Sequence, residues 1–156
     1  MSTVRTIGVV GLLALMAGTT GDALSAEDEV KKVALDINQA FVRNDLEGIA
    51  KYVADDITWF SHTSTKRQDG KKVFIDSLRQ SIASKKSLRW QERDIVVQVF
   101  GDAALVTFLY DHDAEINGKR SSRLSRATYG FAKRSGKWWL VHDHSSAPLA
   151  QATSQG

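Results

Sequence analysis

The spacing of apolar residues changes once along this chain, near Ser87, and this change constrains the fold more than any other feature. Before it, apolar residues recur at helical spacing in three segments, covering 30–41, 46–53 and 74–82. After it, apolar and polar residues alternate, which is the period of half-buried strands. A group of helices followed by a run of hairpin-linked strands predicts an α+β fold.

Capping residues set the helix boundaries. Ser25 followed by Asp28 resembles a capping box, so we expect the first helix to begin there. Asn44 predicts its end, and Asp45 is a suitable N-cap for a shorter second helix that ends at Asp55. Residues 57–62 predict a first strand, residues 63–70 a polar loop, and residues 71–86 a third helix with Phe74, Ile75, Leu78 and Ile82 as its apolar stripe.

Turn dipeptides divide the rest of the domain into strands. Asn117-Gly118 is the dipeptide that suits a type I′ hairpin turn. Gly101-Asp102 and Ser135-Gly136 mark two further turns, and the last strand covers 137–146. The apolar residues change parity within the strand that begins near Leu88, which predicts a β-bulge near Arg93. The small and polar residues 149–156 predict a flexible tail.

The first 26 residues have the layout of a secretory signal peptide. Arg5 precedes an apolar run from Ile7 to Ala17, and small residues follow at 23–26. The apolar run is too short to span a membrane as a helix. We therefore expect a signal peptide over 1–26, a domain over 27–148, a periplasmic or secreted location, and no membrane association after signal removal. An uncleaved anchor helix is the alternative.

Composition excludes several classes of function. The chain has no cysteine, which excludes disulfides, thiolate chemistry and a lipid anchor on cysteine. The net charge is +3 and the basic residues are scattered rather than gathered in one stripe. We therefore expect no nucleic-acid partner.

The order of elements, together with the last two strands, resembles a known superfamily. The residues that carry the resemblance are Arg126-Ala127-Thr128, Gly136-Lys137-Trp138 and the ending Val141-His142-Asp143-His144-Ser145-Ser146-Ala147-Pro148. They resemble the SnoaL-like or nuclear transport factor 2-like superfamily, and the ending is similar to the association domain of calcium/calmodulin-dependent protein kinase II. The resemblance implies a cone-shaped, ketosteroid isomerase-like fold, with three helices packed on a curved antiparallel sheet around a pocket. It also implies a homodimer or higher homo-oligomer formed through the outer sheet face.

Hairpin geometry predicts which side chains share a sheet face. A two-residue turn at Asn117-Gly118 pairs Ile116 with Lys119 and sets His112 opposite Arg123. A two-residue turn at Ser135-Gly136 sets Tyr129 opposite His142. One face then carries Phe108, Tyr110, His112, Tyr129, Phe131, Leu140, His142 and His144, and we expect this aromatic and imidazole face to line the pocket. The other face carries Leu105, Leu109, Asp111, Asp113, Leu124, Arg126, Trp139, Val141 and Asp143.

This register supplies the candidate site. The ligand-binding candidates are Trp59, Tyr110, His112, Arg126, Tyr129, His142 and His144, and the catalytic candidates are His142, His112 and Tyr129. An imidazole moves protons near neutral pH, and a tyrosine hydroxyl stabilises a developing oxyanion. Arg126 has two alternative roles: it binds a ligand carboxylate, or it pairs with Asp111. No carboxylate of the same parity completes a zinc site with the histidines, so we expect no metal and no cofactor.

These features leave two kinds of function open. The first is an exported pocket protein that binds a small, largely apolar organic molecule, with or without cofactor-free acid-base chemistry of the isomerase, dehydratase or cyclase type. The second is a non-catalytic oligomerisation module with an incidental pocket. The superfamily contains both kinds, so the fold alone does not choose between them.

Overall fold

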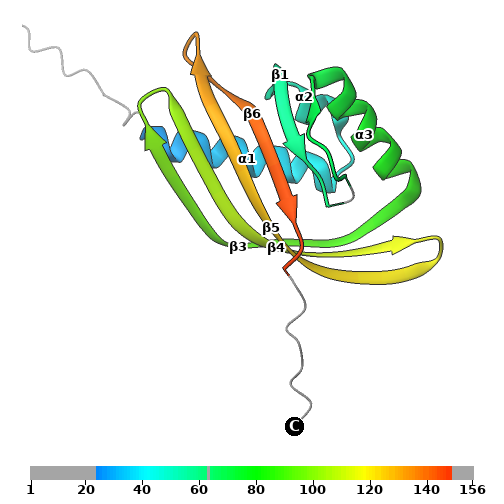
Figure 1. Cartoon of the computed structure of the whole chain (residues 1–156). Helices are drawn as coiled ribbons and strands as arrows, with labels where there is room; N and C mark the ends of the chain where they lie inside the picture. The colour runs from blue at the N-terminus through cyan, green and yellow to red at the C-terminus, as the bar shows by residue number, and fades with distance from the viewer. Residues whose placement is uncertain (1–23, 63, 149–156) are drawn as a thin grey trace, which may run out of the picture.

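The computed structural model describes residues 24–62 and 64–148, and most of the expected signal peptide and the tail lie outside these residues. The elements are shown in Figure 1. In chain order they are α1 (Ala26–Val42), α2 (Leu46–Ala50), β1 (Val53–Phe60), β2 (Gln68–Asp69), α3 (Lys71–Ser84), β3 (Lys85–Phe100), β4 (Ala103–Ile116), β5 (Lys119–Arg134) and β6 (Lys137–Ser146). The α+β fold is confirmed.

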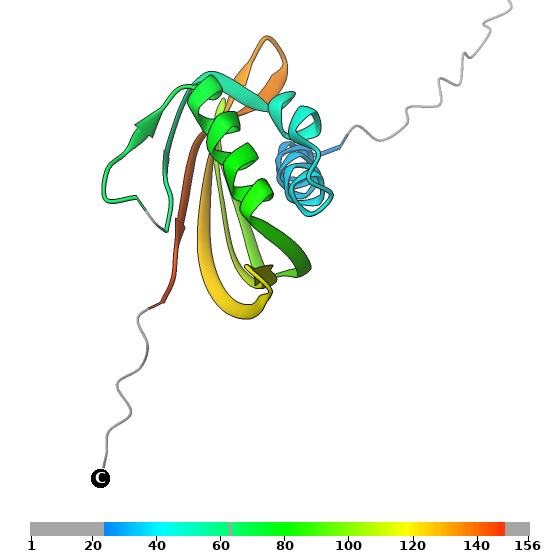
Figure 2. The ribbon, with the colours of Figure 1, turned by 90° about the vertical axis from the view of Figure 1, so that its right-hand side faces the viewer.

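The strands form one curved, open sheet in the order β2-β1-β6-β5-β4-β3. Strands β3 to β6 are joined by hairpins and pair antiparallel, whereas β1 pairs parallel to β6. The sheet is therefore mixed rather than purely antiparallel. A parallel pair is possible here because β1 and β6 are far apart in the chain and need no tight turn between them. Figure 2 shows α1 and α3 on the same side of the sheet.

Both predicted helix caps are present. The Ser25 hydroxyl accepts a hydrogen bond from the Asp28 backbone N–H at 3.1 Å, and the Asp45 carboxylate accepts one from the Gly48 N–H at 2.8 Å. The predicted second helix was too long, because α2 ends at Ala50 and β1 begins at Val53. Val53 pairs with Leu140 of β6, so pairing with a distant strand overrides the local helical spacing.

The predicted register of the β4–β5 hairpin is confirmed. Ile116 pairs with Lys119, and His112 pairs with Arg123. Asn117 and Gly118 have φ values of 51° and 75°, as a type I′ turn requires. The bulge predicted in β3 is also present, since the pairing with β4 shifts between Arg93 and Val96.

The predicted register of the β5–β6 hairpin was wrong by one residue. A bulge lies between the pairs Phe131–Leu140 and Gly130–His142, so Tyr129 is opposite Asp143 instead of His142. Successive side chains alternate between faces, so one extra residue exchanges the faces of everything beyond it. Asp143 and Ser145 therefore share the concave face with Tyr129, and His142 and His144 lie on the convex face.

The hydrophobic core occupies one end of the space between helices and sheet. Many of its strand residues lie near the turns that join β3 to β4 and β5 to β6, and Phe108, Tyr110 and Tyr129 continue it along the sheet. Its members are buried side chains from α1, α2 and the sheet, including Val30, Ala34, Ile37, Ile49, Ala104, Val106, Phe131, Trp138 and Leu140. Toward the β4–β5 hairpin the packing gives way to an open cavity.

Candidate functional site

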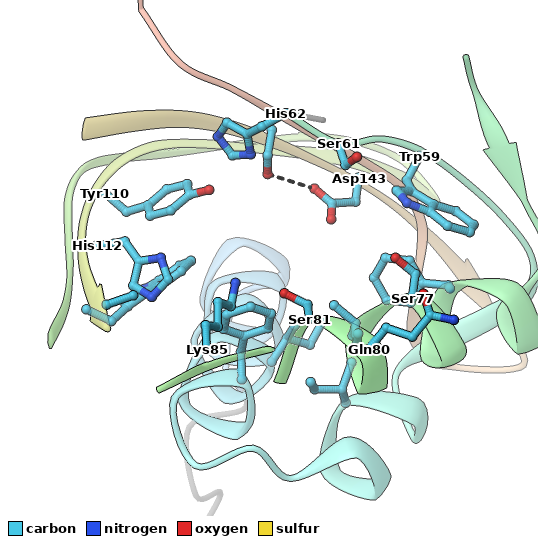
Figure 3. Close-up of a pocket in the computed structure, with 18 of the residues that line it drawn as sticks. Trp59, Ser61, His62, Ser77, Gln80, Ser81, Lys85, Tyr110, His112 and Asp143 are labelled. Atoms are coloured by element: carbon cyan, nitrogen blue, oxygen red, sulfur yellow. Dashed lines mark hydrogen bonds between the residues drawn. The ribbon is translucent and has the colours of Figure 1, made fainter. Parts of the chain in front are cut away.

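A cavity of about 660 Å³ lies between α1, α3 and the concave face of the sheet. This volume is within the usual range of small-molecule sites. Its apolar walls are mainly aromatic, formed by Phe41, Trp59, Phe74, Trp90, Tyr110 and Tyr129. Polar groups also face it, including Ser61, His62, Lys85, His112, Arg123, Asp143 and Ser145. Figure 3 shows Tyr110, His112 and Asp143 of the sheet on one side of this space, and Ser77, Gln80 and Ser81 of α3 on the other.

Helix α3 contributes a wall that is more polar than its sequence suggested. Phe74 is buried, but the turns that follow it present Ser77, Ser81 and Ser84 to the cavity. These serines recur at three- and four-residue spacing and therefore lie along one face of the helix. Figure 3 shows Ser77 and Ser81 on this wall, opposite Asp143. The predicted apolar stripe therefore covers only part of the face that α3 turns inward.

Asp143 of β6 brings a carboxyl group into the cavity. It lies beside Trp59 of β1, its register partner, and the Ser145 hydroxyl donates to its Oδ1 at 3.4 Å. Burial raises the pKa of Asp143 to about 7, although the Ser145 hydrogen bond acts in the opposite direction. A carboxyl group with this pKa exists in both protonation states near neutral pH, which suits it to accept and return a proton.

Tyr110 lies among the aromatic walls and interacts with the same Ser145 hydroxyl as Asp143 does. Its ring stacks on Trp90 with 4.1 Å between centroids. Burial raises the pKa of Tyr110, while the hydroxyls of Ser145 and Ser125 lower it. At neutral pH the Tyr110 phenol is therefore protonated and able to donate a hydrogen bond to an oxygen atom of a ligand.

Two neutral imidazoles face the same space. The Nε2 atom of His62 lies 3.0 Å from the Ser125 hydroxyl, and the His112 ring lies 5.4 Å from that of Trp90. Burial, followed by the positive charges of Arg123 and Lys85, lowers the pKa of His62 to about 4. Burial and the same two charges lower the pKa of His112 to about 4, against a small opposite effect of Asp113. Both rings are therefore neutral at physiological pH.

Tyr129 lines the deep part of the cavity, but its hydroxyl is already engaged. The hydroxyl donates to the Oδ1 atom of Asn38 at 2.8 Å, and both residues are buried. Burial, together with the nearby Asp143 charge, raises the pKa of Tyr129 well above its usual value. Because the Tyr129 hydroxyl already donates its proton to Asn38, Tyr110 is better placed to donate a hydrogen bond to a ligand.

The structure places four of the sequence candidates at the cavity and three elsewhere. Trp59, Tyr110, His112 and Tyr129 line it. His142, His144 and Arg126 do not.

The β5–β6 bulge explains why His142 and His144 lie outside the cavity. His142 Nδ1 contacts the Thr58 hydroxyl at 2.7 Å on the convex face, and His144 is exposed. Phe60 packs edge-on against both rings. His112 therefore cannot share a metal ion with them. Within residues 24–62 and 64–148, no group of three or more His, Asp or Glu side chains is arranged to hold a metal ion.

Arg126 does not line the cavity and does not pair with Asp111. Its guanidinium is exposed on the convex side and donates weakly to the Ala147 carbonyl at 3.5 Å. Asp111, its expected partner, lies 3.4 Å from Arg93 instead. The β3–β4 turn alone does not predict this contact, because the bulge between Arg93 and Val96 shifts the pairing of the two strands.

Sequence reasoning missed Asp143, Ser145, Lys85 and Arg123 as cavity residues. One signal could have identified the first two. Gly130 stands inside a strand, where glycine often marks a bulge or close backbone approach. A Cβ atom at Gly130 would lie only 3.2 Å from the Cβ of His142, so these two residues face each other on the convex side.

The SnoaL-like domain family matches residues 30–150 of the chain. An NTF2-like protein of unknown function from Pseudomonas putida KT2440 is 25% identical, with 84% of this chain and 92% of that chain covered at a TM-score of 0.70. No protein of curated function matches the chain. In the described part of the chain, no helix is both long enough and apolar enough to cross a membrane.

Two other solved structures are similar in fold alone. A ketosteroid isomerase-like protein from Erwinia carotovora atroseptica SCRI1043 is 15% identical, with 80% of this chain and 97% of that chain covered at a TM-score of 0.70. The hub of the S. rosetta calcium/calmodulin-dependent protein kinase II is 21% identical, with 81% of this chain and 100% of that chain covered at a TM-score of 0.66.

Proposed function

The chain belongs to the SnoaL-like domain family, and on that premise we propose that it binds a small, largely apolar organic molecule and moves protons on it without a cofactor. One observation carries this proposal. One aromatic cavity is lined by a carboxyl group, Asp143, a protonated phenol, Tyr110, and two neutral imidazoles, His62 and His112. Titratable groups with perturbed pKa values, gathered in one apolar cavity, are typical of acid-base sites.

The residues suggest a division of roles. Ionised Asp143 removes a proton from a carbon next to a carbonyl group of the ligand, and the electron pair moves onto the carbonyl oxygen. Tyr110 donates a hydrogen bond to that oxygen as its negative charge develops. Protonated Asp143 then returns the proton to another carbon, which is an isomerisation, or to a departing hydroxyl, which is a dehydration.

Deuterium incorporation tests this chemistry without knowledge of the natural substrate. A panel of small aryl ketones is incubated with the protein in D₂O, and loss of the α-proton signals is followed by NMR. We expect exchange with the unaltered protein and its loss in Asp143→Asn. The matched control is Asp111→Asn, which removes a carboxylate from the convex face and should retain exchange. Exchange that persists in Asp143→Asn would contradict the assigned role, and no exchange of any ketone would contradict proton transfer on this class.

Export is part of the proposed function. Its support is the basic start, apolar run and small residues of the first 26 positions, which predict a periplasmic or secreted protein. Ser25 caps α1, so cleavage after Ser25 would remove the cap, whereas earlier cleavage would keep it. The intact mass of protein recovered from the periplasm or medium tests this. A full-length mass, or recovery only from the cytoplasm, would contradict export.

A second candidate is an oligomerisation module. The observation that favours it is the set of exposed apolar side chains on the convex side of β3, β4 and β5, namely Val96, Phe100, Leu105 and Leu124. An uncovered group of this kind is common at protein interfaces. The two functions are compatible, because the cavity opens on the opposite side of the sheet.

A further inference from the structure

We propose that a cationic rim at the open end of the cavity binds an anionic headgroup, so that the ligand is an organic acid with a carboxylate joined to an apolar body. The rim consists of Lys85 and Arg123, with His62 and His112 beside them. This inference rests on the function proposed above and specifies the class of ligand.

The two cations reach the cavity from different elements. Lys85 is the first residue of β3, directly after α3, and its Nζ atom lies 5.3 Å from the centroid of the Phe41 ring. Arg123 lies on β5, directly opposite His112 of β4. Figure 3 shows Lys85 and His112 together at the end of the cavity away from Trp59.

These cations lack the counter-charges that neighbouring arginines have. Arg89 and Arg93 on β3 lie near Asp113 and Asp111 of β4, respectively. Within the part of the chain that the structure describes, no carboxylate forms an ion pair with Lys85 or Arg123. Burial, with the Arg123 charge, lowers the pKa of Lys85.

Like charges that face one partly buried space are unfavourable until an anion arrives. A carboxylate at the rim would relieve this repulsion and accept charge-assisted hydrogen bonds from both cations. The Ser121 hydroxyl also lines the cavity near the rim and adds a neutral donor, whereas the Ser84 hydroxyl donates to the Ser81 carbonyl at 3.0 Å. Beyond them, Phe41, Trp90 and Tyr110 provide apolar surface for the body of the ligand.

Electrostatics also fixes the direction in which such a ligand binds. Ionised Asp143 lies deeper in the cavity and would repel a second carboxylate placed next to it. The headgroup therefore stays at the rim, and the apolar end of the ligand reaches the carboxyl group and the Tyr110 hydroxyl. This arrangement assigns to Lys85 and Arg123 the anchoring role that the sequence suggested for Arg126.

Matched anionic and neutral probes test the rim. The probes are 2-naphthoate and 2-naphthamide, which share an aromatic body and differ in charge, and their Kd values are measured by calorimetry. We expect 2-naphthoate to bind at least about tenfold more tightly than 2-naphthamide, as charge-assisted hydrogen bonds imply. The double variant Lys85→Gln, Arg123→Gln should lose this preference.

The control double variant is Lys86→Gln, Arg120→Gln. It removes the same charge from neighbouring exposed residues that do not line the cavity, and it should keep the preference. Equal affinity for the two probes, a preference that survives in the rim variant, or binding of neither probe would overturn the inference. The deuterium experiment decides the proton-transfer role separately. Asp143→Asn should lose exchange but keep the preference for 2-naphthoate, so failure of one proposal is distinguishable from failure of the other.

Discussion

The Asp143 carboxyl group lowers the folding stability of the protein at neutral and alkaline pH. Its pKa rises from 3.8 to about 7 on folding, because burial disfavours the charged form. Between these two values the folded state holds a proton that the unfolded state has released. Stability from this group is therefore present below about pH 4 and is lost as the pH rises through about 7. A neutral residue at position 143 would therefore make the folded state more stable at neutral and alkaline pH.

The substitution Asp143→Asn should stabilise the protein at alkaline pH and have little effect at acid pH. We expect the free energy of unfolding to rise by about 2 kcal/mol at pH 8, a value reduced from the full effect of the shift because the side chain is only half-buried. At pH 4 the variant and the unaltered protein should be equally stable. Urea denaturation at both pH values measures this. A variant that is no more stable at pH 8 would show that folding does not desolvate the carboxylate.

His62 and His112 have the opposite effect on the pH dependence. Folding lowers the pKa of each imidazole from 6.5 to about 4, so the unfolded state binds the extra protons in this interval. Their contribution is present above about pH 6.5 and is lost as the pH falls toward 4. The comparison of Asp143→Asn with the unaltered protein at each pH cancels these terms, provided that both imidazoles keep their surroundings.

At the scale of elements, the sequence predicted correctly those features that residues close together in the chain determine. Ser25, Asp45 and the Asn117-Gly118 turn act on residues next to them in the chain, and the caps and register they predict are present. The end of α2 and the parallel pairing of β1 depend on β6, which is distant in sequence. The β5–β6 bulge lies between these cases, because its extra residue, Val141, is a local feature but its consequence reaches Asp143. Because this extra residue was not predicted, the fold was predicted correctly but His142 and His144 were placed on the wrong face of the sheet.

Engineered cysteine pairs test the β5–β6 bulge. The chain has no cysteine of its own, so any disulfide comes from the introduced pair. The variant Thr128→Cys, His144→Cys should form a disulfide on mild oxidation, because these residues are register partners. The control is Thr128→Cys, Asp143→Cys, which would be partners only without the bulge and should remain reduced. Mass spectrometry after alkylation measures both. The reverse pattern would return His142 to the cavity face.

The whole molecule presents two faces of different character on opposite sides of one sheet. The concave face is covered by α1 and α3 and encloses the cavity, whereas the convex face leaves Val96, Phe100, Leu105 and Leu124 exposed. Gly130 faces that convex side as well, where it pairs with Leu105 of β4 and lies against His142. A bulge that turns Asp143 inward therefore also determines that His142 and His144 belong to the outer surface.

The exposed convex face predicts that the protein self-associates. A stable dimer buries about 800 Å² on each partner, and apolar side chains that project from neighbouring strands favour such burial. We expect light scattering to give at least twice the mass of one chain. Leu105→Lys should weaken association by about tenfold or more, since it places a charge in the contact. The control Val73→Lys alters another exposed apolar residue, on α3 and away from this face, and should leave the mass unchanged. A monomer at micromolar concentration would exclude the oligomerisation module. If Leu105→Lys loses association but still binds 2-naphthoate, the cavity binds its ligand within a single chain.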